Sequence, residues 1–255
     1  MIRSLYTAVS GMITLENKQN TIANNMANAN TIGYKSEDLV IKSFDEVLLQ
    51  NKDKLVGNQN TRRKLGSISL GAKIDEVTIK FTQGDLKETG AQTDLGINGR
   101  GFFQIQKGNE VVYTRDGNFI VSNEGYLVTS TGDRVLGRNI NSGNVEPIYV
   151  GNSTFNIDRN NNILIDGVAT QTIATSDFED YNTLVKVGDN YYKGDNPINN
   201  ARANIRQGFT ELSNVDITNE MVNMLSTMRN FETNQKILTM IDKTLEQAAN
   251  KVGQV

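Results

Sequence analysis

The chain has 255 residues, a formal net charge of −3 and a pI near 5.2. A duplex-binding surface is normally basic, so this acidic balance argues against a nucleic-acid partner. The chain also contains no Cys, His or Trp, which excludes disulfides, thiolate chemistry and imidazole metal ligands and leaves an enzyme only carboxylates, Ser–Lys pairs or Tyr.

The N-terminal segment, residues 1–35, predicts a helix covered on several sides. Among residues 1–32 only Arg3, Glu16 and Lys18 are charged. No run approaches the ~20 apolar residues that cross a bilayer, so we expect no membrane insertion. A cleavage site is also missing, so we expect no cleaved signal peptide. Apolar residues recur at helical spacing, at Leu5, Val9, Met12, Leu15, Ile22 and Met26.

Four asparagines crowd the end of this segment, at Asn24, Asn25, Asn28 and Asn30. An amide can satisfy backbone groups or other amides without a charge to desolvate. We therefore interpret the cluster as capping the helix and bridging it to neighbouring chains.

Residues 36–83 predict an extended connecting segment with a short helix and a strand. Leu39–Leu49 is compatible with the helix, and the alternation of Ile74–Phe81 favours the strand. The stretch 51–71 is polar and basic, with Arg62, Arg63 and Lys64. We expect a solvated loop there, the alternative being a contact with an acidic neighbour.

Residues 84–211 predict an all-β meander. Both prolines and 16 of the 22 glycines lie within 84–210, and short apolar runs alternate with Gly/Asn/Asp turns. Within the runs, Phe103 and Ile105 point to one side, and Phe119 and Val121 form a similar pair.

No chemical motif in this region is complete. Asp158 to Asn162 begins like a calcium loop, but Ile163 occupies the glycine position and Ala169 the position of the bidentate Glu. The glycines Gly96, Gly99 and Gly101 resemble a phosphate loop without its Lys. We therefore expect no metal, no cofactor and no enzymatic activity. A carboxylate glycosidase acting on peptidoglycan stays an open alternative, which a deep acidic cleft would support.

The C-terminal segment, residues 212–255, predicts a helix of about 35–40 residues, far longer than the globular mean of about 11–12. Ser213 to Asp216 offers N-cap residues. A single apolar seam recurs at steps of three and four, broken only at Gln235. Because one seam offsets little of the cost of ordering such a helix, we expect both termini to become ordered only on assembly. The seam comprises Ile217, Met221, Met224, Met228, Phe231, Leu238, Ile241 and Leu245.

Three blocks of residues resemble the axial proteins of the bacterial flagellar basal body, the rod and hook family. The first runs from Leu5 to Lys35 and includes Ala23-Asn24-Asn25 and Gly33-Tyr34-Lys35. The second includes Gly101-Phe102-Phe103 and Tyr113 to Phe119, and the third Ser213 to Asp216 with Glu220-Met221-Val222. Ile32 stands where the family usually has Pro, and Phe231 where it often has Tyr.

The resemblance implies an α+β fold, with long N- and C-terminal helices paired like a coiled coil and a central all-β domain. It implies a discontinuous polymerisation domain (1–35 and 212–255), the connecting segment (36–83) and an outer β domain (84–211). It also implies a structural subunit of the flagellar rod that assembles into a helical tube and transmits torque to the hook. The implied partners are its own copies, other rod and hook proteins and the flagellar export apparatus, which would export it from the cytoplasm without a cleaved signal.

The length fits a rod protein better than the longer hook proteins, and MIRSL and 51–71 are most similar to the distal-rod member. A proximal-rod or hook-type protein stays open, as does a secreted adhesin or effector with coiled-coil termini.

Overall fold

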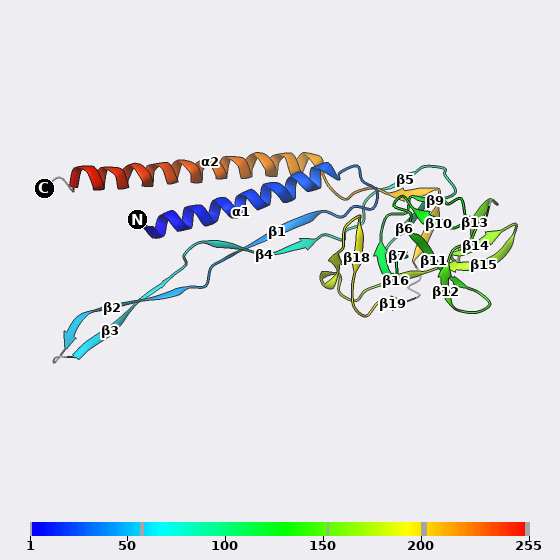
Figure 1. The fold of residues 1–255 in the computed structure, drawn as a ribbon, viewed down its shortest axis with the longest axis horizontal. Coiled ribbons are helices and arrows are strands. Elements are labelled where there is room, and N and C mark those ends of the chain that lie inside the picture. Colours follow the sequence, from blue (N-terminus) through cyan, green and yellow to red (C-terminus); the bar gives the residue numbers. More distant parts are fainter. Residues whose placement is uncertain (1, 57–58, 152, 200–202, 253–255) are drawn as a thin grey trace. The chain divides into compact units, whose positions relative to one another are not determined.

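The computed structural model describes residues 2–56, 59–151, 153–199 and 203–252 (Figure 1). The chain divides into two compact units, which are described separately. The helical unit is drawn from residues 1–26, 37–78 and 217–255, and the β unit from residues 27–36 and 79–216. Among the described residues, no helix is both long enough and apolar enough to span a bilayer.

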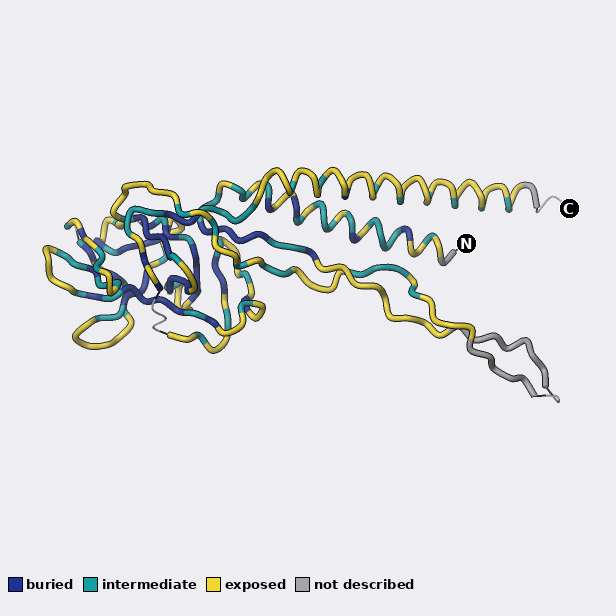
Figure 2. The backbone as a smooth tube through the Cα atoms, turned by 180° about the vertical axis from the view of Figure 1, so that it is seen from behind, coloured by how far each residue is buried: buried dark blue, intermediate teal, exposed yellow. Residues whose placement is uncertain are grey.

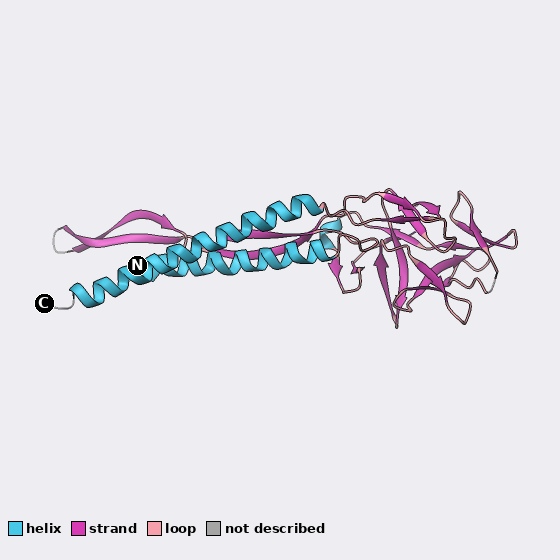
Figure 3. Cartoon of the chain, turned by 90° about the horizontal axis from the view of Figure 1, so that it is seen from above, coloured by secondary structure: helices cyan, strands magenta, loops and turns pink. Residues whose placement is uncertain are grey.

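Two long helices and a ribbon of strands make up the helical unit. Helix α1 (Ile2–Ala27) lies between helix α2 (Ile217–Gln247) and the pair of strands β1 (Glu37–Ser43) and β4 (Ala72–Ile79) (Figures 1 and 2). An antiparallel hairpin, β2 (Val47–Val56) and β3 (Gln59–Ile68), continues the ribbon, and a π-helical turn (Ala248–Val252) continues α2. The helices are cyan and the ribbon magenta in Figure 3.

Contacts of α1 agree with this layering. On one side, the backbone N–H of Ala72 donates to Ser10 Oγ at 3.3 Å, and Thr7 Oγ1 donates to the carbonyl of Leu70 at 3.4 Å. On the other side, a Cβ placed on Gly11 would lie 3.3 Å from Asn234 Nδ2 of α2. A glycine in mid-helix therefore allows close approach of the two helices.

The uncharged polar surface of α1 is satisfied partly by its own backbone. Thr14 Oγ1 donates to the carbonyl of Gly11, Asn17 Nδ2 to that of Ile13, and Thr21 Oγ1 to that of Asn17. Hydroxyls and amides can bond the carbonyl one turn earlier in this way. Such a helix can be covered without desolvating charges.

The expected helix over Leu39–Leu49 is wrong, because these residues form β1 and the start of β2. The run Leu39-Val40-Ile41 is rich in β-branched residues, whose stiff side chains favour strands over helices. The strand expected over Ile74–Phe81 is confirmed by β4. The solvated loop expected around Arg62, Arg63 and Lys64 is wrong, because these residues lie in β3, which pairs with β2. Their side chains lie outside the described part of the structure.

The β unit consists of short strands and one 3₁₀ turn (Tyr181–Thr183). The turns expected from the sequence fall between these strands. In chain order the strands are β5 (Leu86–Glu88), β6 (Leu95–Asn98), β7 (Phe102–Lys107), β8 (Glu110–Thr114), β9 (Phe119–Val121), β10 (Leu127–Thr129), β11 (Arg134–Asn139), β12 (Val145–Pro147), β13 (Phe155–Ile157), β14 (Asn162–Ile165), β15 (Val168–Ile173), β16 (Thr175–Asp177), β17 (Val185–Lys186), β18 (Tyr191–Lys193), β19 (Ile198–Asn199), β20 (Asn204–Gln207) and β21 (Phe209–Glu211).

The connectivity corrects the expectation of a simple meander. Consecutive strands do pair, as in β7–β8 and β13–β14–β15. However, β11 also pairs with β7 and β15, and β8 pairs with β18. Near the end of the unit, β20 pairs with β6 and β21 with β5. Turn signals reveal neighbours in sequence, but they do not reveal these distant pairings.

The core sits on both faces of β7. Phe103 and Ile105 are fully buried in the main apolar cluster, as their alternation predicts. Phe102 is fully buried as well, in a second cluster with Tyr113 and Phe178. Phe119 joins the main cluster, whereas Val121 is 38% exposed at the end of β9.

Candidate assembly site

The less exposed face of α2 is a seam that runs along the helix (Figure 2). The predicted residues Met224, Phe231, Leu238, Ile241 and Leu245 lie on it and are partly buried. Ile217, Met221 and Met228 lie off it and are 42–51% exposed.

Polar residues complete the seam. Thr227 is 4% exposed, and Asn234, which meets Gly11, takes the place at which Gln235 interrupts the apolar pattern. Thr227 Oγ1 donates to the carbonyl of Asn223 at 2.7 Å, so it can be buried at little cost. The apolar pattern alone missed these residues, and the break in spacing at Gln235 was the available signal.

Most side chains of the stripe predicted for helix α1 are partly buried. Ile22 is buried, and Leu5, Val9, Met12, Leu15 and Met26 are partly buried. Two residues outside the stripe, Ala8 and Thr14, are buried more deeply than most of it. The assembly role of all these residues stays a prediction.

Of the four asparagines, Asn25 is the buried one, with 2% exposure. Its Nδ2 donates to the carbonyl of Glu37 at 2.8 Å, and the N–H of Glu37 donates to its Oδ1 at 3.0 Å. The same Nδ2 lies 3.2 Å from Glu220 Oε1. One amide therefore joins α1, β1 and α2.

The remaining asparagines are placed differently. Asn28 accepts from Thr31, both side chain to side chain and backbone to backbone, in the turn after α1. Asn24 and Asn30 are exposed. Asn25 and Asn28 therefore form hydrogen bonds within the chain. Whether the four asparagines also bridge to neighbouring chains is not tested by the structure of one chain.

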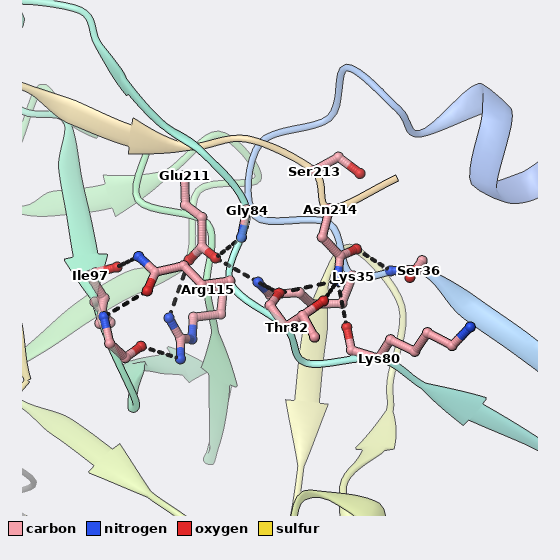
Figure 4. A network of polar contacts seen from close by, with 12 residues as sticks. Lys35, Ser36, Lys80, Thr82, Gly84, Ile97, Arg115, Glu211, Ser213 and Asn214 are labelled. Atoms are coloured by element: carbon pink, nitrogen blue, oxygen red, sulfur yellow. Dashed lines mark hydrogen bonds and ion pairs between the residues drawn. The ribbon is translucent and has the colours of Figure 1, made fainter. Parts of the chain in front are cut away.

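A buried ion triad in the β unit holds together three separate passes of the chain (Figure 4). Lys35 Nζ donates to Glu211 Oε1 at 2.6 Å, and Arg115 lies 3.2 Å from Glu211 Oε2. The Lys35 and Glu211 side chains are fully buried, and that of Arg115 is 3% exposed. Burial lowers the pKa of Lys35 below its ordinary value, against the attraction of Glu211.

Backbone groups complete the surroundings of the triad. The N–H of Gly84 donates to Glu211 Oε1 at 3.0 Å, and Lys35 Nζ also donates to the carbonyl of Thr82 at 2.8 Å. Arg115 donates to the carbonyl of Gly99 at 2.8 Å. A buried ion pair is stable when such bonds satisfy most of its remaining donors and acceptors. Within the described residues, Arg115 Nε is the exception, because it is buried without a hydrogen-bond partner.

Asn214 makes a second tie beside the triad. Its Oδ1 accepts from the N–H of Ser36 at 2.8 Å, and its Nδ2 donates to the carbonyls of Lys80 and Thr82. Asn214 was expected among the possible N-caps of the C-terminal helix. It instead fixes the segment that follows α1 and the segment that precedes α2 to residues 80–82. The role of Lys35, Arg115 and Glu211 was missed, because nothing in a single sequence pairs charges so far apart.

An open polar hollow of about 420 Å³ also lies on the β unit, lined among others by Asp116, Asp189 and Lys186. Burial, reinforced by the nearby Asp94 carboxylate, raises the pKa of Asp116 to about 6. Asp116 therefore binds a proton in mildly acidic solution. Within the described residues, no cluster of three or more carboxylates has the geometry of a metal site.

Comparisons with known proteins cover most of the chain. Residues 5–35 match the model of the flagella basal body rod protein family, residues 96–173 that of the flagellar hook protein FlgE/F/G D1 domain, and residues 206–251 that of the C-terminal part of the flagellar basal body rod FlgEFG proteins.

Full-length relatives agree. The chain is 31% identical to the flagellar basal-body rod protein FlgG of Bacillus subtilis, over 98% of this chain and 99% of that one. It is 30% identical to the flagellar hook-basal body complex protein FlhO of the same organism and 31% identical to the flagellar basal-body rod protein FlgF of Caulobacter vibrioides, in both cases over the full length of both chains. The chain therefore belongs to the flagellar basal-body rod and hook protein family.

Proposed function

We propose that this chain is a structural subunit of the flagellar basal-body rod, which assembles with its own copies into a helical tube and transmits torque to the hook. The observation that carries the proposal is the end-to-end similarity to proteins named as basal-body rod proteins. Its other partners would be further rod and hook proteins and the export apparatus, which would take it up without a cleaved signal. We place it in the distal rod, with a proximal-rod or hook-type position as the alternative, because FlgG proteins of several organisms are among the relatives that it matches over nearly the whole chain.

Within this function, we assign polymerisation to residues 1–35 and 212–255, with α1 and α2 paired along the seam like a coiled coil. Residues 84–211 would form the outer β domain, joined through the connecting segment 36–83. The close approach of Gly11 to Asn234 and the bond between Asn25 and Glu220 support the pairing. We assign the chain a structural rather than an enzymatic role, because the relatives that it matches end to end are named as basal-body rod proteins.

The experiment replaces the chromosomal gene with variants and isolates basal bodies. We expect the wild-type chain in the rod by immunoblot and by antibody labelling in electron micrographs, and we expect deletion to abolish motility. Asn25→Ala should reduce the amount of chain in basal bodies, because it removes the bonds among α1, β1 and α2. The matched control, Asn20→Ala, changes an exposed amide of α1 outside the asparagine cluster and should assemble normally. Motile deletion cells, or basal bodies that lack the wild-type chain, would refute the function.

A further inference from the structure

One exposed surface of the helical unit is an apolar ridge on α2, formed by Ile217, Met221, Val222, Leu225 and Met228. These side chains are 42–61% exposed. At about 100° per residue, Ile217, Met221, Leu225 and Met228 fall within about 80° of one another on one face of the helix, to the side of the seam. Val222 lies at the edge of that face. Contiguous exposed apolar side chains on one helix face mark a surface for another protein.

A second exposed surface of the same unit is an apolar groove of about 580 Å³ between α1 and the ribbon. Val9 and Ile13 of α1 line it, with Phe44 and Leu70 from the ribbon side. Ile13 is 52% exposed and Phe44 40%. A small-molecule site usually adds several convergent polar groups that orient the ligand. This groove offers the Tyr6 hydroxyl, Asp45 and Ser10, and Ser10 already bonds to the backbone of Thr7 and Ala72.

The ridge is convex and the groove concave, and both are apolar. Because the ridge is exposed, it does not fill the groove of its own chain. Two opposite charges indicate how the ridge and the groove would align. The exposed Arg229 lies one helical turn beyond Leu225 of the ridge, and Asp45 lines the groove. Throughout the part of the chain that the structure describes, no ion pair engages Arg229 or Asp45.

We propose that the α2 ridge of one copy docks into the α1–ribbon groove of the next copy, with Arg229 facing Asp45. This contact rests on the proposed function, because it names the surfaces through which the chain would meet its own copies. It joins two different patches, so each copy has one free ridge and one free groove. Such a heterologous contact propagates into an open series rather than closing into a dimer.

Cross-linking tests the contact directly, because the natural chain has no Cys. Ile13→Cys and Leu225→Cys are combined in one chain expressed in place of the wild type, and isolated basal bodies are oxidised and run on non-reducing gels. Cβ atoms must approach to about 3.5–4.5 Å for a disulfide. We expect loss of the monomer band and a ladder of multiples, whereas each single variant should stay monomeric.

The matched control pairs Ile13→Cys with Asn230→Cys, an exposed position on the other flank of α2. It should give no ladder. A ladder with the control pair, a disulfide within one chain, homodimers from a single variant, or a cross-link to a different protein would each overturn the contact.

Charge reversal provides an independent readout. Arg229→Asp and Asp45→Arg should each reduce motility, and the two together should restore it; failure of the pair to recover would count against the contact. The cross-linking result also separates the two proposals. Basal bodies that contain the double-Cys chain but give no ladder overturn the contact alone, whereas basal bodies of the parent strain without the wild-type chain overturn the proposed function as well.

Discussion

The buried ion triad predicts an unequal response to the loss of its members. Glu211 is the only anion of the triad and faces two buried cations, Lys35 and Arg115. In Lys35→Met, Glu211 keeps Arg115 and the N–H of Gly84. In Glu211→Gln, by contrast, two buried cations are left facing a neutral amide. We therefore expect Glu211→Gln to lower the free energy of unfolding more than Lys35→Met does.

The magnitudes follow from the surroundings. Breaking a buried ion pair costs about 3–5 kcal/mol, and Lys35→Met should fall near the lower value because its partner stays bonded. For Glu211→Gln, Lys35 can release its proton. At pH 7, deprotonating a lysine whose ordinary pKa is 10.5 costs about 5 kcal/mol, at 1.36 kcal/mol per pH unit. The electrostatic cost of keeping Lys35 charged in Glu211→Gln therefore cannot exceed about this value.

Urea unfolding of the purified chain, followed by the β-sheet signal in circular dichroism, measures these losses. With a slope of about 2 kcal/mol per molar urea, a loss of 3 kcal/mol lowers the midpoint by about 1.5 M. The double variant Lys35→Met/Glu211→Gln should be more stable than Glu211→Gln alone, because it removes one of the two facing cations. Lys80→Met, at an exposed lysine close to the network, is the control. A double variant less stable than Glu211→Gln would refute the reasoning.

Three further predictions concern the β unit. Gly33→Ala should cost about 2–5 kcal/mol in urea unfolding, because φ is +68° and the new Cβ would collide with the backbone N of Asp116, whereas Gly108→Ala, at φ +62° with open space around it, should cost about 1–2 kcal/mol; equal losses would contradict the contact. Because the pKa of Asp116 is raised from 3.8 to about 6, the folded carboxyl keeps a proton that the unfolded one releases, so stability should fall by about 2 kcal/mol as pH rises from 4 to 6. Asp116→Asn should remove that slope in unfolding measured across the range, and an unchanged slope would assign it to other groups. Limited proteolysis of free monomer should remove both termini and leave a core that retains residues 27–36 and 79–216, and a stable core that begins after residue 36 would contradict the role of the triad.

The sequence was sufficient where structure depends on neighbours along the chain. Helical spacing predicted both terminal helices, and Gly/Asn/Asp clusters such as Lys107-Gly108-Asn109 predicted the turns. Phe103 and Ile105 were correctly paired because the side chains of a strand alternate. The expected helix at Leu39–Leu49 failed because its β-branched residues favour a strand and because it pairs with residues 72–79 and 59–68. The first signal was available in the sequence, whereas the pairing was not.

The candidate site divides in the same way. Periodicity predicted Met224, Phe231 and Leu238 correctly. It missed Thr227 and Asn234, which are polar and occupy seam positions for which only apolar residues were considered. Ile217, Met221 and Met228 had the right spacing but lie on another face. A step of three or four residues is not a whole turn of 3.6 residues. A run of such steps can therefore move gradually around the helix and leave one face for another.

The long reach of the triad bears on the order of events during synthesis. Lys35 and Glu211 are separated by 176 residues, so the contact cannot form until Glu211 has left the ribosome. Distant pairings of this kind also slow folding after release. A secretion channel that accepts only unfolded polypeptide would therefore meet this chain during an interval in which its sheets have not yet closed.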